Sequence, residues 1–65
     1  MNLEEQYIFN IKNGIRAIKL GSKTPKDSNV GYNLNRLKGV NEGMYDDLLA
    51  EYIKIKKDYD LKNKV

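Results

Sequence analysis

The sequence predicts a small all-α domain of three helices, in which a long, a short and a second long helix form a hairpin-like arrangement. In three stretches, apolar residues recur at steps of three and four, which is typical of helices that bury one face. Two short segments containing Gly and Asn separate these stretches. The length of 65 residues allows a single domain, residues 1–65.

The first predicted helix covers residues 2–20. We expect Asn2 to cap its first turn, because an Asn side chain accepts a hydrogen bond from a free backbone N–H there. Gly21 is expected just beyond its end, where Gly adopts a left-handed backbone without strain. The apolar face consists of Leu3, Tyr7, Ile8, Ile11, Ile15 and Ile18.

Gly14 is unusual within this helix, because an interior Gly costs about 1 kcal/mol relative to Ala. Together with Asn10, Ala17 and Gly21 it forms a stripe of small side chains beside the isoleucines. The stripe predicts close approach of a second helix. The alternative is a neutral glycine on a solvated surface.

The short second helix has two competing start signals. Thr24 can act as N-cap before Pro25, or Ser28 or Asn29 can cap a later start. Val30, Leu34 and Leu37 then repeat at helical spacing. The helix is expected to end at Lys38, with Gly39 at the left-handed position beyond it.

The third helix is expected to begin after Asn41 as N-cap and to end among Lys54, Lys56 and Lys57, with residues 60–65 fraying. Because connections are short, we expect the first and third helices to pair antiparallel. The apolar seam of the third helix is longer than the other helices can cover, which predicts a homodimer. The seam residues are Tyr45, Leu48, Tyr52, Ile55 and Tyr59.

The composition argues against an enzyme. The chain has no His and no Cys, so the commonest general base, the commonest metal ligand and thiolate chemistry are all missing. Asp27, Asn29 and Gly31 differ from a calcium loop, since Lys38 occupies the position of the bidentate Glu. A solvated acidic helix face explains Asp46, Asp47 and Glu51. We therefore expect no catalytic site, no cofactor and no metal.

Positive charge is concentrated in the middle of the chain. Residues 12–40 carry a net charge of +6 within a total of +3. Such a segment attracts acidic protein surfaces or phosphates. The candidate partner-binding cations are Arg16, Lys19, Lys23, Lys26, Arg36 and Lys38.

Phe9 and Tyr32 lie off the predicted apolar faces, so they are candidate aromatic anchors for a partner. The alternative is that a helix is rotated and both rings pack inside. For nucleic acid, the residue types that can read base edges are Asn29, Asn33, Asn35 and Arg36.

Residues 44–52 resemble part of the second helix of a family of small helical hairpins that act on the phosphates of sporulation response regulators. Asp46, Leu48, Leu49 and Tyr52 match, whereas Glu42 and Gly43 replace the Ser-Gln of that family. The resemblance covers nine of 65 residues, and we assign no family on it.

The interpretation that the sequence favours is a small non-catalytic interaction protein that binds and modulates a larger protein with an acidic surface. A host protein or a cognate protein could be that partner. Ten Lys, eight Asn and six Ile suggest an AT-rich coding sequence, which fits a regulator or inhibitor from a phage or mobile element. The alternative is a nucleic-acid-binding regulator that uses residues 12–40. No apolar run suits a bilayer or a signal peptide, so a cytoplasmic location and no membrane partner are expected.

Overall fold

Both ends of the first helix, α1 (Leu3–Lys19), lie where the sequence predicts them in the computed structural model, which describes residues 2–63. Asn2 Oδ1 accepts a hydrogen bond from the Glu5 N–H at 2.8 Å. At the other end, Gly21 has a left-handed φ of 80°. The N–H groups of Gly21 and Ser22 donate to the carbonyls of Ile18 (3.1 Å) and Ala17 (2.8 Å), which completes a Schellman motif.

The connection to α2 (Val30–Lys38) uses both of its start signals. Thr24 Oγ1 accepts from the Asp27 N–H at 3.1 Å and starts a single turn. Asn29 ends that turn with φ 60° and becomes the N-cap residue of α2, without a side-chain cap. Ser28 Oγ caps the first turn of α2 instead, because it accepts a hydrogen bond from the Val30 N–H at 3.3 Å.

At the end of α2, the predicted role of Gly39 is wrong. Gly39 is the C-cap residue with φ −80°, not a left-handed residue beyond the cap. Instead, the Leu37 carbonyl stabilises the turn by accepting hydrogen bonds from the N–H groups of Val40 (2.9 Å) and Asn41 (2.8 Å). This tight turn leads directly into the third helix, so no left-handed step is needed.

The third helix, α3 (Glu42–Lys62), begins as predicted but is longer. Asn41 Oδ1 caps it by accepting from the Met44 N–H at 3.1 Å. The predicted end among Lys54, Lys56 and Lys57 is wrong, because Ile55 and Tyr59 pack against the core and hold the later turns. Asn63 Nδ2 donates to the Tyr59 carbonyl at 2.9 Å and closes the helix. Residues 60–62, where fraying is expected, belong to α3. Residues 64 and 65 lie outside the described residues.

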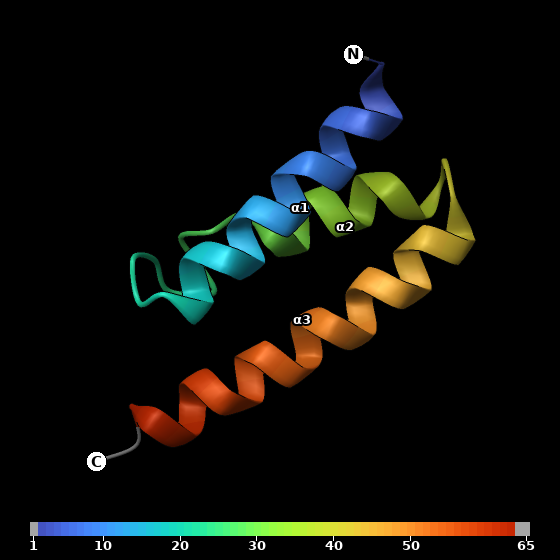
Figure 1. Cartoon of the computed structure of the whole chain (residues 1–65). Coiled ribbons are helices and arrows are strands. Elements are labelled where there is room, and N and C mark those ends of the chain that lie inside the picture. The colour runs from blue at the N-terminus through green and yellow to red at the C-terminus, as the bar shows by residue number, and fades with distance from the viewer. Residues whose placement is uncertain (1, 64–65) are drawn as a thin grey trace.

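Helices α1 and α3 run in the same direction, and α2 runs back between their ends (Figure 1). The predicted antiparallel pairing of the first and third helices is therefore wrong. Each of the two connections reverses the chain, and two reversals restore the original direction. The molecule is elongated, with dimensions of 40 × 19 × 14 Å.

The core lies where the three helices meet, and α1 and α2 supply most of it. Only Leu48 of α3 is buried, although its neighbours on the same face pack against the core. Gly14 is buried where α1 meets the start of α2, next to Ser28 and Val30. The predicted close approach at Gly14 is thus confirmed. The buried apolar side chains are Ile11, Ile15, Ile18, Val30, Leu34, Leu37 and Leu48.

Candidate interaction surfaces

Phe9 on α1 and Tyr32 on α2 both point away from the core. Their side chains are 53% and 60% exposed, so the alternative in which they pack inside does not hold. The Arg36 guanidinium lies 5.2 Å from the centroid of the Tyr32 ring, one helical turn along α2. This cation–π contact holds an aromatic ring and a cation together at the surface of α2.

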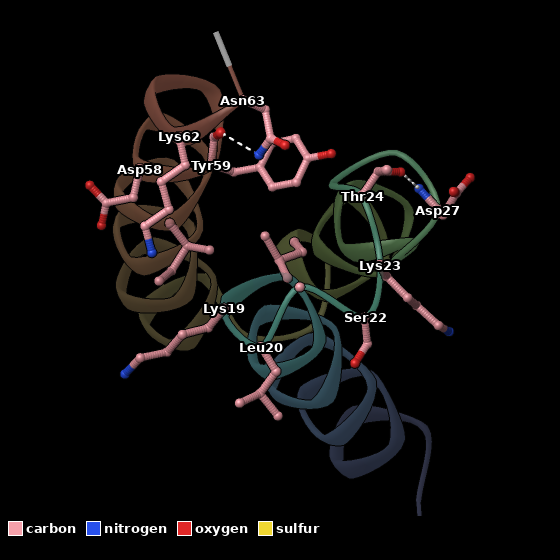
Figure 2. A pocket seen from close by; sticks show the side chains of 13 residues that line it. Lys19, Leu20, Ser22, Lys23, Thr24, Asp27, Asp58, Tyr59, Lys62 and Asn63 are labelled. Carbon is pink, nitrogen blue, oxygen red and sulfur yellow. Dashed lines mark hydrogen bonds between the residues drawn. The ribbon is translucent and has the colours of Figure 1, made fainter. Parts of the chain in front are cut away.

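The six candidate cations are all exposed, but the structure does not gather them into one cluster. Lys38 turns toward α3, where its ammonium lies 5.7 Å from the centroid of the Tyr45 ring. Lys19 is the last residue of α1 and Lys23 lies in the connection after it, and their side chains point to opposite sides of the chain (Figure 2). Arg16 lies on α1, Lys26 in the connection and Arg36 on α2. The name basic surface is used below for the exposed candidate residues on α1, α2 and their connection; these are Phe9, Arg16, Lys23, Lys26, Tyr32 and Arg36.

A polar groove of about 390 Å³ runs between α1 and the start of α2. Asn33 is only 7% exposed; its Nδ2 donates to the Asn29 carbonyl at 2.8 Å. Its Oδ1 accepts from Asn10 Nδ2 at 3.4 Å. The groove is lined by Asn10, Asn13, Gly14, Ala17, Lys23, Ser28, Asn29 and Asn33.

We call this polar groove the amide groove. It corrects one expectation from the sequence, and it contains a feature that the sequence did not predict, the burial of Asn33. The sequence places Asn33 among the residues that can read base edges, yet Asn33 is buried and its amide is used within the chain. Its position three residues after Val30 places it on the buried face of α2, and that spacing could have revealed it. Asn29 and Asn35 stay exposed.

A second hollow, of about 500 Å³, lies between the C-terminal ends of α1 and α3 (Figure 2). We call it the end hollow. Ile18, Ile55 and Tyr59 form its apolar part, and Tyr59 reaches from α3 toward Thr24 in the connection. The charged residues lining it are Lys19, Lys23, Asp27, Asp58 and Lys62. Sequence reasoning missed this hollow because it placed the two helices antiparallel, which would have separated their C-terminal ends.

The predicted dimer seam lies against the chain's own core. Leu48 is 3% exposed, and Tyr45, Tyr52, Ile55 and Tyr59 are partly buried against the same cluster. Packing within one chain therefore accounts for their helical spacing. Association through this seam stays a prediction.

Asp46, Asp47 and Glu51 are exposed on α3. Within residues 2–63, no three acidic side chains are grouped closely enough to hold a metal ion. None of the described helices has both the length and the apolar character needed to cross a bilayer.

Comparison with family models, with curated proteins and with solved structures returned no match for this chain. The resemblance of residues 44–52 to the sporulation hairpins therefore gains no support from them.

Proposed function

We propose that this chain is a small, non-catalytic binding protein that modulates a larger protein by docking its basic surface on an acidic region of that partner. The observation that carries the proposal is the pair of exposed aromatic rings, Phe9 and Tyr32, on helices rich in cations. Between residues 6 and 41, the only acidic side chain is Asp27. Aromatic and Arg side chains are enriched at protein interfaces and carry much of their binding energy.

Charge supports the same proposal through the kinetics of association. A local excess of positive charge steers an acidic partner toward the surface before contact is made. The contact between Arg36 and Tyr32 already brings a cation and an aromatic ring together in the free protein, so a partner can engage both at one place. We place this activity in the cytoplasm, with a regulator or inhibitor of a phage or mobile element as the biological setting that fits the size and composition.

The test measures affinity for a partner captured from a nuclease-treated lysate of the source organism and then purified. Tyr32→Ala and Arg36→Ala should each weaken binding at least about tenfold, the effect of losing one central interface residue. Lys57→Ala removes the same charge as Arg36→Ala from an exposed position on α3 and serves as the matched control. Equal affinities for the Arg36 and Lys57 variants would contradict the proposal.

The second candidate function is nucleic-acid binding, which the amide groove between α1 and α2 favours. Asn10, Asn13 and Asn29 present amide groups there beside the Lys23 ammonium. Amides hydrogen-bond to base edges, and a cation binds the phosphate backbone. A labelled oligonucleotide titrated at increasing salt tests this function, because affinity for duplex should fall with a log–log slope of about −0.9 per phosphate contact.

The matched variants for this test change the same amount of charge in different parts of the chain. Replacing Lys23, Lys26, Arg36 and Lys38 by Glu should abolish binding. Replacing four lysines of α3 by Glu should weaken it far less; these are Lys54, Lys56, Lys57 and Lys62. An absence of binding at low salt would rule the nucleic-acid function out.

A further inference from the structure

We propose that Asn13 is a site of spontaneous covalent modification, at which the unfolded chain loses ammonia and the folded chain is protected. This inference is independent of the proposed function. It begins from the sequence, because Asn13 is the one asparagine among eight that precedes a glycine. A glycine offers the least hindered backbone nitrogen, since it carries no side chain beside that nitrogen. Attack by the following nitrogen on an asparagine side chain is therefore fastest at Asn13.

The reaction exchanges the side-chain amide for a carboxyl group. The Gly14 nitrogen forms a bond to Asn13 Cγ, the bond from Cγ to Nδ2 breaks, and ammonia leaves with the proton of the Gly14 nitrogen. Water then opens the resulting five-membered imide at one of its two carbonyls. Opening at Cγ gives aspartate. Opening at the main-chain carbonyl gives isoaspartate, in which the chain runs through Cβ and Cγ.

The folded structure blocks the first step in two ways. Asn13 and Gly14 lie in the interior of α1, where each backbone N–H donates to the carbonyl four residues earlier, so the Gly14 nitrogen is not free to attack. Helical backbone angles also hold that nitrogen away from Asn13 Cγ. Water does not limit the second step, because the Asn13 side chain is exposed and lines the amide groove.

The helix cannot open at this point by itself, so the reaction follows the unfolding of the domain. Gly14 is buried at the contact between α1 and α2, and the core residues on either side, Ile11 and Ile15, are buried as well. Leaving the helical conformation there requires α1 to separate from α2. Refolding is much faster than the loss of ammonia, so the rate of modification measures the fraction of unfolded molecules.

The contact that protects Asn13 also favours glycine as its reactive neighbour. A Cβ at position 14 would overlap Val30 Cγ2. The isoaspartate product cannot rebuild α1, because it adds a methylene to the main chain between Ile11 and Ile15, which must share one face of the helix to be buried. Modification therefore turns a transient unfolding into a permanent one and sets a lifetime for the protein.

The test compares the conversion of Asn13 in native buffer and in concentrated urea, at one pH and one temperature. The full chain is incubated, and peptide mass spectrometry then detects the exchange of NH2 for OH. In urea, Asn13 should react faster than every other asparagine. Native buffer should slow its conversion at least about tenfold, since few molecules are unfolded there. Asn29 and Asn41 lie outside the helices but precede Val30 and Glu42, so they are internal controls for the need for glycine.

Two variants change the stability and leave the Asn13–Gly14 pair intact. Gly31→Ala, which adds a methyl group in open space on α2, should slow the conversion in native buffer about two- to fivefold. Asn41→Ala, which removes the cap of α3, should accelerate it about fivefold. In urea, the wild type and both variants should react at one rate.

Three results would overturn the proposal: equal rates in native buffer and urea, faster conversion at another asparagine in urea, or native rates that neither variant changes. The separated isoaspartate product gives an independent measurement. Far-ultraviolet circular dichroism should show that it has lost helix, whereas Asn13→Asp, which has a normal main chain, should keep its helices. Equal helix content in the two would contradict the effect on α1.

Discussion

Adding one methyl group at Gly14 should destabilise the protein, although Ala is the better helix former. A Cβ at this position would overlap Val30 Cγ2 and lie 3.2 Å from the Ser28 carbonyl oxygen. Val30 is fully buried and β-branched, so its side chain cannot rotate aside without strain. Relief therefore requires α1 and α2 to move apart.

The expected size of the effect is the difference between two opposing contributions. Overpacking a core position costs about 1–3 kcal/mol. Replacing an interior helical Gly by Ala returns about 1 kcal/mol. We expect Gly14→Ala to lower the free energy of unfolding by about 1 kcal/mol, which for a domain of this size lowers the melting temperature by about 4–8 °C.

The control is the same substitution at Gly31 on α2. A Cβ at Gly31 meets no atom within 4 Å, so the helical gain should appear alone. Gly31→Ala should raise the free energy of unfolding by about 0.5–1 kcal/mol. Both variants are measured by urea unfolding and thermal melting followed by circular dichroism.

A double-mutant cycle assigns the Gly14 effect to its proposed cause. In a Val30→Ala background the overlapping methyl is gone, so adding Ala at position 14 should no longer be destabilising. A stabilisation of the wild type by Gly14→Ala as large as that by Gly31→Ala would contradict the close contact between Gly14 and Val30. An absence of coupling between positions 14 and 30 would contradict it as well.

Three further predictions concern asparagines. Asn41→Ala removes the cap of α3 and should lower the free energy of unfolding, measured with urea, by about 1 kcal/mol. Asn35→Ala, at an exposed position in α2, should not destabilise the protein. Asn29 has φ 60°, so Asn29→Ala should be less stable than Asn29→Gly by about 1–2 kcal/mol in thermal melting; equal stabilities would exclude the left-handed backbone. Asn33→Asp replaces a buried amide donor by an acceptor that faces the Asn29 carbonyl. It should lower the free energy of unfolding by about 1–3 kcal/mol. The same loss for Asn35→Asp would refute this reason.

Features set by a few neighbouring residues could be predicted from the sequence. The caps at Asn2 and Asn41, the left-handed turn at Gly21 and the apolar faces of the helices all depend on local chemistry. Where two local signals compete, the prediction could not decide. In the connection before α2, Thr24 starts one turn and Asn29 starts the helix, because the packing of Val30 against Gly14 favours the later start.

Features that depend on contacts between helices could not be predicted. The burial of Asn33 requires the register of α1 against α2, which brings Asn10 within hydrogen-bond distance. The extra turns of α3 depend on the packing of Tyr59 against the hydrophobic core. The end hollow needs the relative direction of two helices that are not neighbours in the chain.

The parallel direction of α1 and α3 changes the interpretation of part of the positive charge. Two helices that end side by side place the negative ends of their macrodipoles together, and cations near those ends offset the repulsion. Lys19 and Lys62 occupy the last turns of these helices. These lysines therefore have a role within the chain, and Arg16 and Arg36 have the same role in the last turns of α1 and α2. Arg36 differs from the others in that its guanidinium lies against an exposed aromatic ring, Tyr32, and this contact gives it the clearest claim to a partner.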